Sequence, residues 1–207
     1  MKDIIYYSVI GGLFLMNIIA LYRSRKKDNI AYRIVLFSRH TDWIWALLII
    51  VFVITSIFFI EPYVPQFLKF GLFSLLDKQG TNANVEIINQ SSSISPILVV
   101  VIFAFFILLL PKAALWEEER FRHGTIELKK SIFSNVKFGL AHCLIGVPIW
   151  IGIILILIGF IYQLKYIHEY KKANEMEMAL EASTSLHGKY NLILIFLLMM
   201  ALLTLTK

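Results

Sequence analysis

The chain lacks the features that would tie it to a disulfide-bonded, repetitive or signal-cleaved protein. It has a single cysteine, Cys143, so no intrachain disulfide is possible. It has no internal repeat, heptad array or low-complexity tract, which predicts one domain over residues 1–207. Its N-terminus lacks a basic segment and a small-residue cleavage site, so we expect the apolar stretch 4–22 to be a retained helix.

Charged residues are also scarce, at 16%, while hydrophobic residues reach 58% and the mean hydropathy is +0.74. Soluble globular domains contain about 45–50% apolar residues. The segments 4–22, 41–60 and 96–110 are apolar and almost free of charge, and about 20 such residues cross a bilayer as a helix. A soluble domain of this length cannot hide so many apolar stretches in one core, so the sequence predicts an integral membrane protein.

The basic residues gather in short clusters between the apolar stretches. The chain has a net charge of +6 and a pI of about 9.4, which by itself suggests a nucleic-acid partner. Clustering of Lys and Arg on the cytoplasmic side of a membrane explains the same pattern without one. Residues 23–40 carry six Lys/Arg and 116–137 carry five. We expect both segments to be cytoplasmic loops, with the N-terminus outside and no nucleic-acid partner.

The apolar stretches predict an all-α polytopic bundle of about six spanning helices with a polar intramembrane cavity open to the cytoplasm. Two places leave alternatives open. Residues 66–76 suit an interfacial or a re-entrant helix. Residues 138–164 suit either two helices separated at Gly146-Val147-Pro148 or one kinked helix. We expect 165–180 to be a charged and helix-prone linker, and the spanning helices to be 4–22, 41–60, 96–120, 131–146, 148–164 and 181–204.

Three polar groups lie where membrane helices normally avoid them, and such residues usually face a protein interior or a wet cavity. Glu118 and Arg122 are four residues apart and can pair on one helix face, which leaves Glu117 turned away from that partner. His187 and Asn191 are also four residues apart. If the helix of Glu117, the helix of His142 and the helix of His187 and Asn191 adjoin, a carboxylate, two imidazoles and a carboxamide converge. This set can activate water and stabilise an oxyanion.

These residues carry a resemblance to a known family. The chain resembles the CPBP family of intramembrane proteases, which includes the CAAX prenyl-protein endopeptidases and is marked by EExxxR, FxxxH and HxxxN or HxxxD in that order. The resemblance covers about 96–204, which would be the catalytic core. The matching motifs are Glu117-Glu118-xxx-Arg122, Phe138-xxx-His142 and His187-xxx-Asn191.

The resemblance implies a metal-free endopeptidase without a cofactor. Glu117 would be the general base for water, assisted by His142, and His187 and Asn191 would stabilise the oxyanion. Glu118 and Arg122 would form a structural ion pair at the site. The implied partners are the lipid bilayer and a peptide or lipid-modified protein substrate. The implied location is a bacterial plasma membrane with the active site toward the cytoplasm.

The sequence departs from the family at one point and leaves three other functions open. His123 separates the Phe121-Arg122 pair from Gly124, where family members usually have the glycine directly. Two His and one Glu also form a common zinc ligand set, although HExxH is missing. The same fold also suits a non-catalytic immunity or scaffold protein, or a small transporter that relays protons, although the sequence has no inverted repeat.

Overall fold

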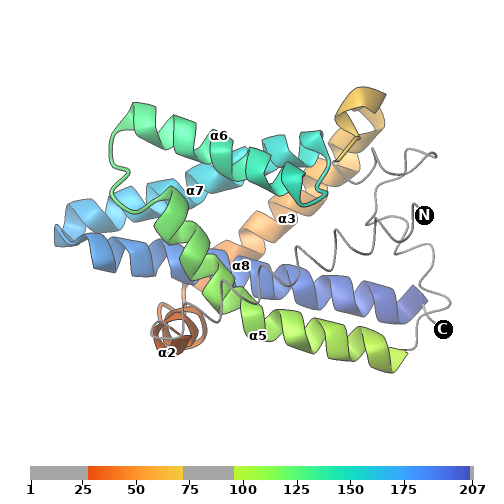
Figure 1. Ribbon diagram of the computed structural model, residues 1–207, viewed down its shortest axis with the longest axis horizontal. Coiled ribbons are helices and arrows are strands. Elements are labelled where there is room, and N and C mark those ends of the chain that lie inside the picture. Colours follow the sequence, from red (N-terminus) through yellow and green to blue (C-terminus); the bar gives the residue numbers. More distant parts are fainter. Residues whose placement is uncertain (1–27, 72–95, 206–207) are drawn as a thin grey trace, which may run out of the picture.

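The computed structural model describes residues 28–71 and 96–205, and within these ranges the protein is all-helical, without a strand. The predicted all-α class is confirmed. The helix expected at 4–22 and the part of 66–76 beyond residue 71 lie outside the described residues. The described elements (Figure 1) are α2 (Asp28–Tyr32), the π-helix η2 (Arg33–Phe37), α3 (Asp42–Ile60), the 3-10 helices η3 (Glu61–Tyr63) and η4 (Gln66–Leu68), α5 (Pro96–Phe121), α6 (Leu128–Leu144), α7 (Ile149–Ala173) and α8 (Met176–Leu205).

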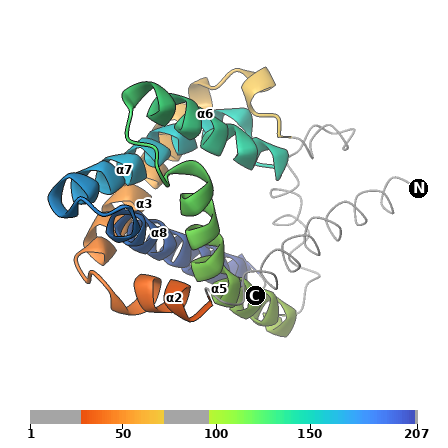
Figure 2. The same ribbon diagram turned by 60° about the vertical axis from the view of Figure 1, so that its left-hand side comes forward.

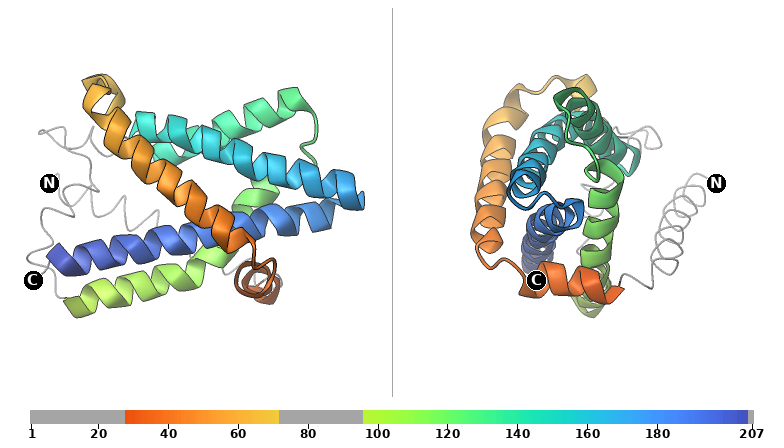
Figure 3. Two further views of the ribbon diagram at one scale, coloured as in Figure 1. Left: turned by 180° about the vertical axis from the view of Figure 1, so that it is seen from behind. Right: turned by 90° about the vertical axis from the view of Figure 1, so that its left-hand side faces the viewer.

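The central element of the bundle is α8. It packs against α3, α5 and α7, and also against η2, and the end-on view in Figure 3 shows these helices around it. All nine residues from 182 to 190 are buried, whereas a helix on a protein surface normally leaves one face exposed. The middle of α8 is therefore the place where side chains from several helices meet.

Residues 138–164 form the end of one helix and the beginning of another. Gly146 lies between α6 and α7 with a φ of 97°, a backbone conformation that side chains with a Cβ rarely adopt. Pro148 follows as the N-cap residue of α7, and proline suits the start of a helix because it lacks a backbone N–H. The interpretation with two helices is confirmed.

The segment 165–180, expected as a charged and helix-prone linker, is helical as expected but belongs largely to the two long helices on either side. α7 continues to Ala173 and α8 begins at Met176, so two residues connect the helices. The first of them, Asn174, has a left-handed φ of 55°, and asparagine tolerates this conformation better than most residues at a helix C-terminus. The long extension of α7 has to be stabilised by something other than apolar burial, because the segment is rich in charge.

Ion pairs supply that stabilisation. Lys165 on α7 lies 3.2 Å from buried Asp42 at the start of α3. One turn further along α7, Glu169 lies 3.1 Å from Arg39. Lys165 and Glu169 thus hold α7 against the residues around the start of α3, a contact that the sequence pattern alone did not indicate.

The segment 23–40 was expected to be a loop. The structure describes its residues 28–40, and 28–37 of these are helical. α2 packs against α5, and η2 packs against α8; Figure 2 shows α2 lying across the bundle between α3 and α5. Val35 is fully buried and fills the space beside Gly188, where a Cβ would come within 2.4 Å of its side chain. Buried Lys189 donates hydrogen bonds to the carbonyls of Ser38 (2.6 Å) and Arg39 (3.2 Å), and so caps this segment.

Among the described residues, three helical stretches are long and apolar enough to cross a membrane, namely Asp42–Tyr63, Ile149–Ala173 and Met176–Ala201. The surface of α3 suits contact with the lipid tails of a membrane. Large apolar side chains are exposed along most of its length, including Ile44, Leu48 and Phe58. A soluble monomer rarely exposes a continuous apolar surface of this kind, whereas lipid tails would cover it.

α6 and α7 approach each other closely at a pair of glycines. A Cβ on Gly139 would lie 2.4 Å from the carbonyl oxygen of Gly152, and a Cβ on Gly152 would lie 2.4 Å from Sγ of Cys143. Small residues allow helix backbones to approach in this way in membrane proteins, where packing replaces the hydrophobic effect between helices. This contact sets the position of α6, and therefore of His142 at its end.

Replacing Gly139 with alanine is expected to destabilise the protein, although the same change in an unpacked helix would stabilise it by about 1 kcal/mol. The added methyl group would meet the backbone of α7, and overpacking of this kind costs about 1–3 kcal/mol. Thermal unfolding of the purified protein should show a midpoint lower by roughly 2–10 °C. Leu140→Ala, at the exposed neighbouring position, serves as the control. An unchanged or higher midpoint for Gly139→Ala would contradict the close contact.

Candidate active site

Three helices bring the candidate residues together in the middle of the bundle. α5 continues through Pro111 to Phe121 and so carries Glu117 and Glu118 to the centre. α6 contributes His142 in its last turn, and α8 contributes His187 within its buried stretch. These residues come from segments more than twenty positions apart in the chain, so only the packing of the helices can join them.

A fully buried ion pair forms the base of the site. The guanidinium of Arg122 lies 3.1 Å from Oε1 of Glu118, and neither side chain is exposed to solvent. Nδ1 of His187 lies 2.8 Å from the same carboxylate oxygen. Breaking a buried ion pair leaves an uncompensated charge, so Glu118 ties α5 to α8 at this point.

Aromatic rings enclose the guanidinium and the imidazole. The Arg122 guanidinium lies 4.1 Å from the ring centre of Phe138 and 5.6 Å from that of Tyr162, distances at which a cation is attracted to the face of a ring. The Tyr162 ring stacks on His187, with centroids 4.6 Å apart and an interplanar angle of 19°. The rings exclude water from the ion pair and fix the plane of the imidazole.

Sequence reasoning missed three residues that support this arrangement. Asn135 is fully buried on α6, and its Oδ1 accepts a hydrogen bond from Arg122 at 3.5 Å. Gly159 leaves room for this contact, since a Cβ there would lie 2.7 Å from Asn135 and 3.0 Å from Arg122. Tyr162 is the third. Asn135 could have been found, because it shares a helix face with Phe138 and is a polar residue in an apolar setting; a tyrosine or glycine in α7 carries no such signal.

Glu117 faces both histidines. Its Oε2 lies 3.6 Å from Nε2 of His187 and 3.9 Å from Nε2 of His142. These distances exceed those of a direct hydrogen bond and suit groups that share a bridging water. The Oε2 atom is buried and makes no hydrogen bond with any of the described residues.

The hydrogen-bond partners of the two Nδ1 atoms indicate which nitrogen of each imidazole carries a hydrogen. Nδ1 of His142 lies 2.8 Å from the carbonyl oxygen of Phe138, which can only accept, so this nitrogen carries the hydrogen. Nδ1 of His187 faces the Glu118 carboxylate and carries one for the same reason. When both rings are neutral, each Nε2 is an acceptor. Three acceptors thus surround one point, and a water molecule there can donate hydrogen bonds to two of them.

Asn191 lies one turn beyond His187 on α8 and is half-buried. In the described part of the chain, no hydrogen bond or ion pair joins its side chain to Glu117, His142 or His187. The structure therefore brings together Glu117, Glu118, Arg122 and the two histidines, and shows no polar contact between them and the Asn191 carboxamide.

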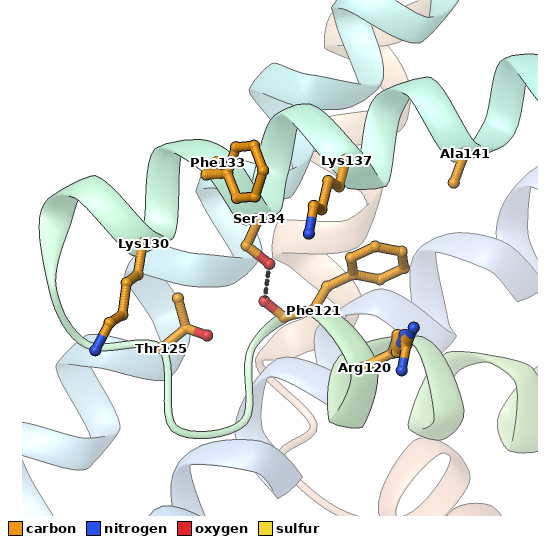
Figure 4. A pocket seen from close by; sticks show the side chains of 8 residues that line it. All are labelled: Arg120, Phe121, Thr125, Lys130, Phe133, Ser134, Lys137 and Ala141. Atoms are coloured by element: carbon orange, nitrogen blue, oxygen red, sulfur yellow. Dashed lines mark hydrogen bonds between the residues drawn. The ribbon is translucent and has the colours of Figure 1, made fainter.

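A cavity of about 550 Å³ lies beside this cluster, between the end of α5 and α6. Phe121 and Ala141, which line it, directly adjoin Arg122 and His142 in the chain, but neither of these two nor Glu117 lines the cavity. Figure 4 shows Phe121 between the two helices, with the hydroxyl of Ser134 donating a hydrogen bond to its carbonyl oxygen. This cavity therefore adjoins the cluster without including it, and the polar intramembrane cavity expected from the sequence stays a prediction.

Within residues 28–71 and 96–205, no group of three or more His, Cys, Asp or Glu side chains is arranged to hold a metal ion. Comparison of the chain with known protein families, with curated proteins and with solved structures gives no match. The resemblance to the CPBP proteases accordingly rests on the three sequence motifs and stays a prediction.

Glu118→Ala is expected to destabilise the protein by about 3–5 kcal/mol, because it leaves Arg122 buried without its carboxylate partner. Glu127→Ala is the matched control, since Glu127 pairs with Lys130 at 2.9 Å on the surface and exposed pairs contribute about 0–1 kcal/mol. Thermal or denaturant unfolding in one detergent compares the two variants. Similar small losses in both would contradict a structural role for the Glu118–Arg122 pair.

Proposed function

We propose that this protein is a multi-pass membrane endopeptidase of the CPBP type, in which Glu117 activates a water molecule to hydrolyse a peptide bond. The observation that carries the proposal is the approach of Glu117 Oε2 to Nε2 of both His142 and His187. A buried carboxylate beside two imidazoles, with a second carboxylate and an arginine behind them, is a set suited to general acid–base catalysis. The order of the three motifs is the second support.

The reaction follows from the roles of these groups. Water, hydrogen-bonded to Glu117 and to Nε2 of His142, gives a proton to the carboxylate as its oxygen attacks the carbonyl carbon of the peptide. The carbonyl oxygen becomes an oxyanion, which His187 in its imidazolium form and the Asn191 carboxamide would stabilise. The C–N bond then breaks, and Glu117 returns the proton to the leaving nitrogen. Each turnover consumes one water molecule and leaves the protein unchanged.

Glu118 and Arg122 would orient the site rather than touch the substrate. The carboxylate of Glu118 holds Nδ1 of His187 at 2.8 Å, which directs Nε2 toward Glu117. Arg122 balances the charge of Glu118 at 3.1 Å. A ring held in one orientation loses little entropy when the reaction begins, and this is the advantage of a preorganised site.

The proposed topology has about six spans and the site toward the cytoplasm of a bacterial cell. It is supported by the three membrane-length stretches and by the arrangement of the helix ends. In Figure 1 the α5–α6 connection and the α7–α8 turn lie at one end of the bundle, and the start of α5 lies at the opposite end. Lys129 and Lys130 at the start of α6 and Lys171 and Lys172 at the end of α7 flank the first two, and basic residues of this kind are typical of cytoplasmic ends. The proposed substrate is a peptide or lipid-modified protein held at the membrane.

Glu117→Gln is expected to lower turnover by about 10²–10⁴-fold, because the amide has nearly the same shape but cannot accept the proton of water. Purified wild type and variant would be tested on a panel of membrane peptides that includes prenylated peptides, with and without EDTA. Glu119→Gln, the same change on the next residue of α5, is the control and should retain activity.

Three results would contradict this proposal. Full activity of Glu117→Gln would exclude Glu117 as the base. Loss of activity in EDTA, with recovery on addition of zinc, would favour metal-assisted hydrolysis. Absence of cleavage across the panel by well-folded wild type would favour the non-catalytic alternative, an immunity or scaffold protein that binds a peptide without cutting it.

Asn191→Ala is expected to reduce turnover by about 10²–10³-fold, the usual effect of losing one oxyanion donor, while the KM for a cleaved peptide changes little. Its half-buried position without a partner in the cluster predicts that the unfolding midpoint stays the same. Single-turnover measurements separate the chemical step from binding. An unchanged rate would leave His187 alone as the donor to the oxyanion.

A further inference from the structure

The cavity between α5 and α6 has a basic lining. Arg120, Lys130 and Lys137 line it, and no carboxylate does. Lys130 pairs with Glu127. Among the described residues, Arg120 and Lys137 have no hydrogen-bond or ion-pair partner, and Lys137 lies over the ring of Phe133 at 4.2 Å. Two cations from two different helices therefore border one space without an anion to balance them.

The surface next to this cavity is apolar. Phe133 lines the cavity and is exposed at 62%, and other large apolar side chains of α6 are exposed beside it, among them Leu128, Ile132, Leu140 and Leu144. Figure 4 shows Phe133 and Lys137 projecting from the same helix, above the end of α5. An occupant that satisfies both parts of this surface has an anionic group and apolar chains.

We infer that the cavity binds the phosphate-bearing headgroup of an anionic lipid, with its acyl chains along the exposed apolar side chains of α6. The cavity lies at the end of α5 where the apolar run gives way to charge, which is the depth of lipid phosphates. Basic pockets between membrane helices on the cytoplasmic side are suited to anionic headgroups, since anionic lipids are concentrated in that leaflet. Arg and Lys bind phosphate oxygens by charge-assisted hydrogen bonds.

The inference depends on the membrane location of the chain and not on hydrolysis. Arg120 and Lys137 belong to neither the proton-transfer groups nor the buried ion pair. A lipid bound here would hold the ends of α5 and α6 together, next to Phe121, whose ring contacts that of Phe138 with centroids 5.5 Å apart. The site would therefore lie one residue from Arg122 without contacting the cluster.

The test uses the purified full chain in detergent micelles with phosphatidylglycerol or phosphatidylcholine of identical acyl chains, and native mass spectrometry measures the bound lipid. The wild type should retain phosphatidylglycerol at least about tenfold better than phosphatidylcholine. Arg120→Gln with Lys137→Gln should abolish this preference. The control pair, Lys129→Gln with Lys171→Gln, removes the same charge from exposed positions outside the cavity and should keep most of the preference.

A second variant, Ala141→Phe, fills the cavity without changing charge and should also release phosphatidylglycerol, while circular dichroism and gel filtration verify the fold. Equal loss in the pocket pair and the control pair would overturn the inference, because it would indicate unspecific surface attraction. Equal retention of both lipids by the wild type, or full retention by Ala141→Phe, would overturn it as well. Displacement of the lipid by millimolar inorganic phosphate would show a site for a free anion instead.

Discussion

The arrangement of the site depends on one buried interaction, the ion pair of Glu118 and Arg122 with His187 attached to it. Two full charges and an imidazole lie where no water reaches them. Such a group is costly to bury unless each member is paired. Here α5 supplies both charges, and each charge contacts a different helix. Arg122 contacts Asn135 and the ring of Phe138 on α6, and Glu118 contacts the imidazole of His187 on α8. The ion pair thus specifies which helices must adjoin, which apolar packing alone does poorly between membrane helices.

α8 carries polar contacts on two opposite faces. His187 points to α5 and its carboxylates, whereas Lys189, two residues later, points to the carbonyls that end the segment before α3. Successive positions on a helix are about 100° apart, so residues two apart face nearly opposite directions. The central helix is therefore fixed on both sides by directional contacts, and the imidazole has little freedom to move away from Glu117.

The fold class and the pairing of Glu118 with Arg122 could be derived from the sequence because both follow from short-range rules, whereas the approach of α5, α6 and α8 to one another could only be assumed. Long apolar runs predict helices, and the spacing of Glu118 and Arg122 predicts that they can pair. The length of α7 could not be derived, because Lys165 and Glu169 find their partners near residue 40, more than 120 positions away. Asn191 was assigned to the site from its spacing to His187. Spacing along one helix does not show which side chains of the neighbouring helices lie next to that residue.

The cap that Lys189 provides has a consequence for how sequences with this fold can diverge. Its hydrogen bonds go to main-chain carbonyls, which every residue type has, so positions 38 and 39 can change identity without losing the contact. The lysine itself cannot be exchanged as freely, because few side chains reach so far and donate in several directions. Gly188 and Val35 show the opposite case, because the side chain of Val35 fills the space that a side chain at position 188 would need. Neighbouring positions on one helix turn thus obey different rules: Lys189 is retained while the residues that it caps change, and position 188 changes only together with position 35.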